Sequence, residues 1–453
     1  MRVAVTGGSG QLGTLILRRL ADTRAVKEIV AIDLRPPLVV SSKLREVRAD
    51  VRDPSLAQHL AACDAVIHLA FLVARRGRRE LQDDVNVRGS ANVFDAALQA
   101  GVRRILYASS VAAYGVVAGL PVPVVETTPR TRQAEFWYAC AKFDVEARLD
   151  QLEAAHPELS VARFRPAILI GRRMDHQLGA AMRRGLFPDG GSMPLVWDED
   201  VADAFLLALK SGARGAFILA AEEPLPARDL ARAAGLRRLR VPRGPLRALE
   251  AIATGLRLLP PADPGWLTAA DFPLVYSSAK ARAELGWKPR CPTAREVMRS
   301  YAENVPRRLD RRLAVFARLV DGASRREPPR ADLAGYEATV HLDLTGPGGG
   351  DLTLRARDGR VRLLRGAPPP DGPGPRGAAS QRAVVTLRAA TLLDLLAGRA
   401  DLAGAQLSGR LRVDGQALAG MLVSGLVESF RAAARLKGLR GLLARRLARW
   451  MAG

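Results

Sequence analysis

Cysteine and histidine are scarce in this sequence, and neither residue type clusters. Cys63, Cys140 and Cys291 lie far apart and form no C-x-x-C pair. This spacing argues against a disulfide framework and against a zinc site, and it fits a reducing compartment such as the cytoplasm. The five histidines form no ligand cluster along the sequence either. We therefore expect no metal centre and a cytoplasmic location.

Long hydrophobic runs are also missing. No apolar stretch reaches the roughly 18 residues that a membrane-spanning helix requires. A strand pattern begins at Arg2, which leaves no space for a basic and apolar secretory leader before it. The sequence thus predicts neither a transmembrane helix nor a signal peptide.

Lysine is rare, whereas arginine is abundant. The formal net charge is +23, although lysine occurs at only seven positions. One interpretation is an anionic partner, such as nucleic acid, acidic lipid or a phosphorylated substrate. The other is a proteome biased towards arginine, and the scatter of arginines along most of the chain favours it. No base-reading motif accompanies the charge, so we expect no nucleic-acid partner.

The chain, at 453 residues, is long enough for two domains, and its hydrophobic pattern changes part-way along. Up to about residue 304, short apolar strands alternate with helices. The strands are expected at 3–5, 29–32, 65–69 and 105–107, and the main helices at 12–20 and 84–100. This alternation is typical of a parallel sheet covered on both faces. Residues 1–304 are therefore predicted to form an α/β, Rossmann-like, doubly wound domain.

The second part of the chain follows a linker at 305–330, which holds a short amphipathic helix near Phe316. From Tyr336 onward, apolar and polar residues alternate. Period two with a polar partner face is typical of antiparallel strands that bury one side. Helical segments follow near 391–397 and 416–436. We predict a smaller α+β domain at 331–436 and a basic amphipathic tail at 437–453.

A glycine loop lies between the first strand and the first helix. It reads Thr-Gly-Gly-Ser-Gly-Gln-Leu-Gly, with glycines at Gly7, Gly10 and Gly13. Glycine permits a tight turn, close approach of a pyrophosphate and close packing of the helix on the sheet. Gln11 and Leu12 open the helix, whose N-terminus offers free N–H groups to phosphates. The loop predicts a dinucleotide site.

Two acidic positions accompany the loop. Asp33 ends the second strand, where a carboxylate can accept hydrogen bonds from the adenosine ribose and repel a 2′-phosphate. We therefore expect NAD rather than NADP, although Arg35 could soften the preference. Asp50 and Val51 follow a third strand and are expected at the adenine edge, with a plain loop aspartate as the alternative.

Several further segments, in this order and spacing, resemble the extended short-chain dehydrogenase/reductases, which include the NAD-dependent epimerase/dehydratases. They are His68-Leu69-Ala70, Asn86-Val87-Arg88-Gly89-Ser90, Ser109-Ser110-Val111-Ala112-Ala113-Tyr114-Gly115, Tyr138-x-x-x-Lys142, Arg165-Pro166-(x4)-Gly171, Asp200-Val201-Ala202 and Leu285-Gly286-Trp287-Lys288-Pro289. The resemblance covers about two-thirds of the chain. It implies an NAD-dependent enzyme in which Leu69, Ala70 and Asn86 contact the cofactor.

The resemblance also implies a catalytic centre of Ser110, Tyr138 and Lys142. Tyr138 and Lys142 are one helical turn apart, so their side chains share a face. A phenol titrates near pH 10, and the Lys142 ammonium is expected to lower that pKa so that Tyr138 can act as the base. Ser110 would hydrogen-bond the reacting oxygen, Lys142 would hold the nicotinamide ribose, and Asn86 would support Lys142 through water.

The substrate half gives a weaker signal. Residues 192–197, Ser-Met-Pro-Leu-Val-Trp, are mostly apolar, whereas sugar-nucleotide enzymes of this family usually carry a basic or aromatic pattern there. This departure favours a lipophilic small-molecule substrate. The arginine-rich loop 75–79 either contacts an anionic group or forms a solvated charge run.

The second domain resembles sterol-carrier-protein-type lipid-binding domains, most densely in the Leu-x-Gly-x-Leu-x-Val-x-Gly stretch from Leu407 to Gly415. The resemblance implies a lipid ligand. The alternative is a module that only packs or dimerises, which leaves a homodimer open. The tail places leucines and Trp450 opposite arginines, so it either lies peripherally on an anionic membrane or caps the domain.

These observations favour an NAD-dependent oxidoreductase that acts on a hydroxyl or carbonyl group of a steroid- or isoprenoid-like substrate. Two alternatives stay open: a nucleotide-sugar epimerase or dehydratase, and a non-catalytic NAD-sensing lipid-transfer protein. The intact set Ser110, Tyr138 and Lys142 speaks against the second, since a sensor need not keep all three.

Overall fold

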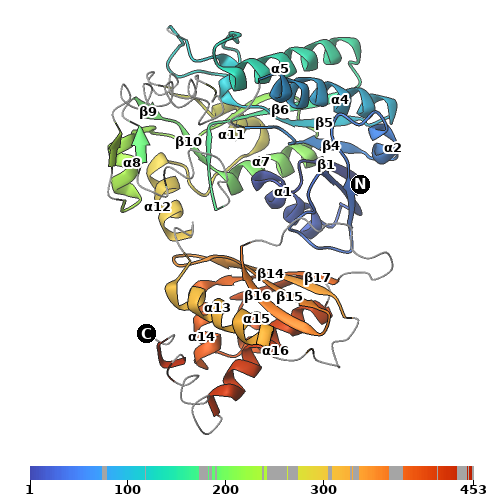
Figure 1. Cartoon of the computed structure of the whole chain (residues 1–453). Coiled ribbons are helices and arrows are strands. Elements are labelled where there is room, and N and C mark those ends of the chain that lie inside the picture. Colours follow the sequence, from blue (N-terminus) through green and yellow to red (C-terminus); the bar gives the residue numbers. More distant parts are fainter. Residues whose placement is uncertain are drawn as a thin grey trace, which may run out of the picture. The chain divides into compact units, whose positions relative to one another are not determined.

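The computed structural model divides the chain into two compact units (Figure 1). Unit 1 comprises residues 1–37 and 43–302, and unit 2 comprises residues 38–42 and 303–453. The structure describes all residues except 74–78, 118, 173–181, 183–185, 189–190, 237–238, 242–262, 264–273, 305–308, 327–328, 330–335, 367–380, 416, 436–445, 447 and 451–453. Each unit is described by itself.

Unit 1 is built on a parallel seven-stranded sheet in the order β11-β6-β5-β4-β1-β2-β3. The strands are β1 (Arg2–Thr6), β2 (Glu28–Asp33), β3 (Leu44–Arg48), β4 (Ala65–His68), β5 (Arg104–Ala108), β6 (Ser160–Pro166) and β11 (Gly215–Leu219). β4 is buried along its whole length, as expected of a strand covered on both faces. The predicted α/β doubly wound fold is confirmed.

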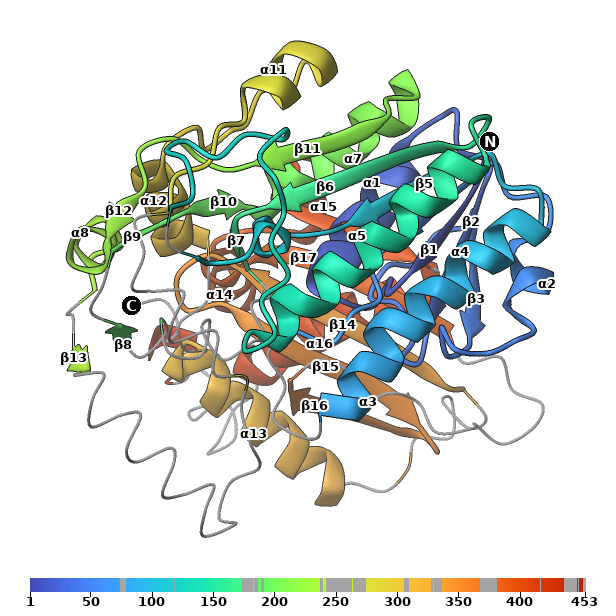
Figure 2. The same ribbon diagram turned by 90° about the horizontal axis from the view of Figure 1, so that it is seen from above.

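Helices cover both faces of this sheet (Figures 1 and 2). α1 (Gln11–Asp22) and α7 (Asp198–Ser211) pack together on one face. α2 (Leu56–Leu60), α4 (Gly89–Gln99) and α5 (Trp137–Ala155) cover the other. The strand order reverses between β1 and β4, because the chain winds outward in both directions from that pair. Ligands of open α/β sheets bind at the carboxyl ends of strands at such a point.

The helix predicted at 84–100 is interrupted. α3 (Arg79–Asp83) is followed by a π-helical turn, η1 (Asp84–Arg88), and only then by α4. π-Turns are rare and often lie at functional sites. Sequence periodicity does not reveal such a turn, because one extra residue per turn only shifts the apolar pattern. Of the arginine-rich loop 75–79, residues 75–78 lie outside the described residues, and Arg79 begins α3.

The structure describes ten further elements in unit 1. They are η2 (Val111–Tyr114), β7 (Ile168–Ile170), β8 (Leu186–Pro188), β9 (Ser192–Met193), β10 (Leu195–Trp197), β12 (Leu225–Pro226), α8 (Ala227–Ala233), β13 (Leu239–Val241), α11 (Ala279–Leu285) and α12 (Ala294–Asn304). Trp287 Nε1 donates to Asp200 O at 2.8 Å, which joins the two sequence segments that extend the resemblance towards the end of unit 1.

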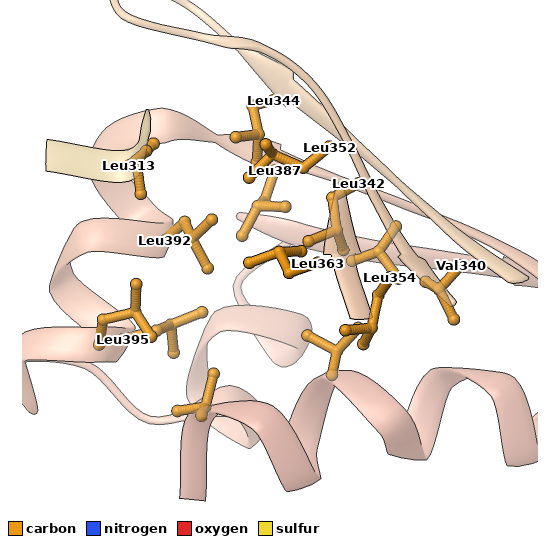
Figure 3. Packing of buried hydrophobic residues seen from close by; sticks show 14 of the residues in the cluster. Leu313, Val340, Leu342, Leu344, Leu352, Leu354, Leu363, Leu387, Leu392 and Leu395 are labelled. Atoms are coloured by element: carbon orange, nitrogen blue, oxygen red, sulfur yellow. The ribbon is translucent and has the colours of Figure 1, made fainter. Parts of the chain in front are cut away.

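Unit 2 contains a five-stranded sheet in the order β16-β15-β14-β17-β18, with helices on one face (Figure 1). Its elements are α13 (Arg311–Arg326), β14 (Ala338–Thr345), β15 (Gly350–Arg357), β16 (Arg360–Arg365), β17 (Gln381–Arg388), α14 (Ala389–Ala397), α15 (Leu402–Leu407), β18 (Leu411–Gly415) and α16 (Ala417–Arg435). Alternating leucines such as Leu342 and Leu354 point from the sheet towards Leu392 and Leu395 of α14 (Figure 3).

Two expectations for unit 2 were wrong in detail. β14 pairs antiparallel with β15 but parallel with β17, so the sheet is mixed. The helix expected within the linker is α13, which is longer than predicted and buries Leu313 and Phe316 in the apolar core. Because these two side chains are buried there, α13 belongs to the core of unit 2 and is not a linker between the two units.

Among the described residues, no helix is long and apolar enough to cross a membrane. The tail expected at 437–453 lies mostly outside the described residues. Its two interpretations therefore stay predictions.

Candidate active site

The glycine loop turns at the carboxyl ends of β1 and β4. Gly7 has a φ of +73°, and a Cβ atom there would lie 2.6 Å from Ala70 N. A Cβ atom on Gly13 would lie 2.2 Å from Gly7 O. Gly10 precedes α1 without a side-chain cap, so the first amides of Gln11 and Leu12 keep their N–H groups available at the helix start. The cradle thus fits a bound pyrophosphate.

Asp33 lies beside this loop, at the end of β2. Its Oδ2 accepts a hydrogen bond from Ser9 N at 3.0 Å, and its Oδ1 accepts one from Arg35 N at 3.0 Å. A carboxylate oxygen can accept more than one hydrogen bond, so the same group can still receive ribose hydroxyls. Asp33 therefore both shapes the glycine loop and presents a negative charge beside it.

Asp50 has a different setting. Its carboxylate accepts hydrogen bonds from Arg52 Nε at 2.9 Å and Arg52 Nη2 at 2.7 Å, and Arg52 also contacts Asp84. The hydrogen bond from Arg52 outweighs burial and holds the pKa of Asp50 below its usual value. Val51 is buried against Gly89, where a Cβ atom would lie 2.7 Å from Val51 Cγ2. Contact of either residue with an adenine stays a prediction.

Tyr138 and Lys142 lie on the first two turns of α5. Lys142 is 2% exposed, and its Nζ lies 5.8 Å from the centre of the Tyr138 ring. Lys142 Nζ donates to Ala108 O at 2.6 Å and to Tyr107 Oη at 3.2 Å. The structure thus brings together the pair predicted from its i, i+4 spacing.

Ser110 completes the set. It lies two residues after the end of β5 and is 8% exposed. Its Oγ accepts a hydrogen bond from Ala112 N at 3.2 Å. Burial raises the pKa of Tyr138 to about 12, and a hydrogen bond with Ser110 opposes that rise. The expectation that Lys142 lowers the pKa of Tyr138 is wrong for the protein alone, because burial dominates and Lys142 turns towards Ala108 and Tyr107.

Asn86, on the π-helical turn η1, is 2% exposed. Its Oδ1 accepts from Leu72 N at 2.7 Å, and its Nδ2 donates to Leu72 O at 3.1 Å. Both functional ends of the amide are thereby engaged with one backbone residue. Asn86 fixes the segment after Leu69 and Ala70, whereas its predicted water-mediated support of Lys142 stays untested.

The start of α5 is held by a residue that the sequence did not single out. Asp263 Oδ2 accepts from Tyr138 N at 2.9 Å, and Asp263 Oδ1 accepts from Trp137 N at 3.2 Å. Phe136, the residue before the helix, provides no side-chain cap. Asp263 satisfies two of the free amides at the helix start and thereby positions the Tyr138 backbone.

Glu146 lies one further turn along α5 and is fully buried. It accepts from Arg165 Nε at 2.9 Å on one oxygen and contacts Arg130 on the other. Ser109 Oγ also donates to Glu146 Oε1 at 2.5 Å. Burial alone would raise the pKa of Glu146, but Arg165, Ser109 and Arg130 together lower it. This network ties α5 to β6 and to the residue next to Ser110.

Gln11 connects the glycine loop to a second buried carboxylate. Gln11 Nε2 donates to Asp198 Oδ2 at 2.9 Å, and Asp198 is 3% exposed at the start of α7. A Cβ atom on Gly171 would collide with that carboxylate, which explains the glycine in the predicted Arg165-to-Gly171 segment. Burial raises the pKa of Asp198 to about 7.

The tight contact at Gly13 makes a testable prediction. In Gly13→Ala, the new methyl group must displace the Gly7 carbonyl, so we expect the free energy of unfolding to fall by about 1–3 kcal/mol and NAD affinity to fall with it. Gly10→Ala is the matched control, because its Cβ atom would lie 3.3 Å from Gly7 O. Urea unfolding measures the stability of both variants. Equal stability of the two variants would contradict the steric argument.

Unit 2 contains a polar group that the sequence did not indicate. His341, Asp343 and Asp351 place one potential ligand atom each within 4.8 Å of one another. His341 Nε2 already lies 2.7 Å from Asp351 Oδ1, so this pair is hydrogen-bonded without an ion. The strand register explains the cluster, because Asp343 lies opposite Asp351. The prediction that the histidines form no ligand cluster considered only neighbours along the sequence, so it missed this contact between two strands.

Comparison with known families decides the class of both units. Residues 3–219 match the NAD dependent epimerase/dehydratase family, and residues 320–428 match the SCP-2 sterol transfer family. The chain joins one domain of each family. Unit 1 is thus an NAD-dependent enzyme domain of the epimerase/dehydratase type, which confirms the class and the cofactor expected from the sequence.

Individual relatives share the first part of the chain. An uncharacterized protein, Rv0501, from Mycobacterium tuberculosis is 27% identical over 64% of this chain and 81% of its own length. A 2-alkyl-3-oxoalkanoate reductase from Stenotrophomonas maltophilia is 28% identical over 51% of this chain and 73% of its own length. The solved UDP-glucose 4-epimerase from Thermotoga maritima shares the fold, with a TM-score of 0.53 and 19% identity over 66% of this chain and 98% of its own.

Proposed function

We propose that the protein is an NAD-dependent oxidoreductase that acts on a hydroxyl or carbonyl group of a lipophilic substrate. The observation that carries this proposal is the placement of Tyr138 and Lys142 on one face of α5, with Ser110 hydrogen-bonded to Tyr138. A half-buried phenol beside a buried amine suits proton transfer to or from a substrate oxygen.

The residues take distinct roles in this proposal. The amides around Gly7 and Gly10 and the start of α1 would hold the pyrophosphate of NAD, and Asp33 would hold the adenosine ribose. NAD, when bound, accepts or supplies the hydride. Tyr138 removes the proton from the substrate hydroxyl, or returns it to a carbonyl oxygen. Ser110 orients that oxygen, and Lys142, in its charged form, would hold the nicotinamide ribose.

The lipophilic substrate is supported by two independent features. Residues 193–197 are all apolar, and Leu195, Val196 and Trp197 of β10 are buried. The Stenotrophomonas relative is named for an alkyl-substituted oxo acid. The SCP-2 family match further supports a lipid ligand in unit 2, which we propose to hold or deliver the substrate.

The proposal is tested by following NADH formation with a panel of steroid and isoprenoid alcohols. A panel of sugar nucleotides is run beside it with products separated by chromatography, because an epimerase or dehydratase returns the hydride to its substrate and releases no NADH. Turnover of lipid alcohols is expected. Turnover of sugar nucleotides alone would instead support a nucleotide-sugar epimerase or dehydratase. The name of the matched family is consistent with that alternative. NAD binding without turnover of either panel would favour the hypothesis of a non-catalytic, NAD-sensing lipid-transfer protein.

The charge of Asp33 makes a prediction about cofactor choice. In Asp33→Asn, the repulsion between the carboxylate and a 2′-phosphate disappears, so the preference for NAD over NADP is expected to fall on the order of tenfold. Fluorescence titration with each cofactor measures the ratio. Asp53→Asn is the control, since that carboxylate caps the turn at Ser55 instead. An unchanged ratio would assign cofactor choice to another residue.

A further inference from the structure

Lys142 is enclosed by aromatic rings as well as by hydrogen-bond acceptors. Its Nζ lies 3.4 Å from the centre of the Phe71 ring and 4.8 Å from that of Tyr107. Phe71 also meets Tyr138 edge to face, with ring centres 5.7 Å apart. Phe71 thus contacts both members of the proposed catalytic pair, although neither its sequence position nor its residue type suggests such a role.

The hydrogen bonds of Lys142 leave room for this contact. An ammonium has three N–H donors, and two of them are directed to Ala108 O and Tyr107 Oη. The electron-rich face of an aromatic ring attracts a cation that has been removed from water. The Phe71 ring therefore occupies the position from which it can stabilise the charged form of Lys142.

The position of Phe71 is fixed by its neighbour. Asn86 clamps both the N–H and the C=O of Leu72, the residue after Phe71. The Phe71 ring also packs against the apolar cluster that contains Val66 and Val93. The π-helical turn that carries Asn86 thereby positions a ring on the proposed catalytic lysine.

We propose that Phe71 is a positioning residue that keeps Lys142 protonated through the face of its ring, with the Asn86–Leu72 clamp holding that ring in place. The inference rests on the proposed role of Lys142 in the oxidoreductase reaction. Four other titratable groups act on the same amine: Tyr107 of β5, His68 of β4, and Tyr138 and Glu146 of α5. Burial lowers the pKa of Lys142 well below its usual value, and Glu146 opposes that fall. Phe71 adds a second opposing contribution.

The test is an NMR titration of the full chain labelled with ¹³C at the lysine Cε atoms. Only seven lysines contribute signals, and Lys142→Met identifies the one of interest. In Phe71→Leu, the pKa of Lys142 is expected to fall by about one unit relative to the wild type. Phe71→Met, which replaces the ring by a longer unbranched chain, should produce a similar fall, and Phe71→Tyr should keep the wild-type value.

Phe205→Leu is the control, because it also replaces a phenylalanine ring by leucine but lies on α7 and packs against Phe164. Its Lys142 titration should match the wild type. A Lys142 pKa that is unchanged in both Phe71→Leu and Phe71→Met, with the fold intact by circular dichroism, would overturn the inference. The titration needs no turnover, so its result is independent of whether the substrate panel succeeds.

Discussion

Tyr138→Phe is expected to lower the rate of NADH formation by about 10²–10⁴-fold, the usual contribution of a positioned proton-transfer group. The substitution removes the phenolic oxygen and leaves the ring contacts with Phe71 and Phe136 in place. NAD affinity and the unfolding midpoint should therefore change little. Because burial raises the pKa of Tyr138 to about 12, the wild-type rate of alcohol oxidation should also rise with pH as the phenolate population grows.

Tyr276→Phe provides the control for this experiment. Tyr276 is buried, and its hydroxyl has no hydrogen-bond partner within the described part of the chain. Removing that hydroxyl should leave the rate unchanged. Equal rates for wild type and Tyr138→Phe would remove Tyr138 from the reaction, whereas equal losses in both tyrosine variants would indicate a general effect on packing.

Glu146→Gln is expected to lower the free energy of unfolding by about 3–5 kcal/mol. The substitution leaves Arg165, which is 4% exposed, without its charged partner in the interior. A buried and uncompensated guanidinium is costly because water cannot solvate it. Urea unfolding followed by circular dichroism measures the difference. A loss below about 1 kcal/mol, the value typical of exposed pairs, would show that the network contributes little.

Asp95→Asn is the comparison variant for that measurement. It removes an ion pair with Arg148 in which both side chains are exposed, so a change below about 1 kcal/mol is expected. The pH dependence gives a second check. The pKa of Glu146 is lower in the folded protein than its ordinary value near 4.3, so its stabilisation is present above that value and is lost as the pH falls through the folded pKa. The gap between wild type and Glu146→Gln should therefore close in acid.

Much of the cofactor cradle could be predicted because its signals are local. Gly7, Gly10 and Gly13 lie in one turn between a strand and a helix, and Asp33 ends the next strand. Tyr138 and Lys142 could be paired from their spacing alone, since residues four apart share a helix face. Glu146 continues the same spacing from Lys142, so the same rule could have identified it.

Other parts of the site depend on contacts between distant segments. Asp263 reaches Tyr138 N from 125 positions along the chain, and Asp198 reaches Gln11 from 187 positions. Phe71 follows β4, and Lys142 bonds Ala108 at the end of β5, so their contact depends on the pairing of these two strands. The parallel pairing of β14 with β17 is equally hidden, because alternation along one strand specifies a buried face but not the direction of its partner.

The composition of unit 2 has a practical consequence for the design of fragments that contain one unit alone. This unit includes residues 38–42 as well as everything from residue 303 onward, and a Cβ atom on Gly415 would lie 3.2 Å from Val40 Cγ1. Cutting the chain at the proline-rich segment near 328 would also remove α13, which buries Phe316 in the core of unit 2. Unit 2 is therefore not a continuous segment of the chain. A fragment that begins at residue 303 keeps α13 but lacks residues 38–42, which belong to the same compact unit.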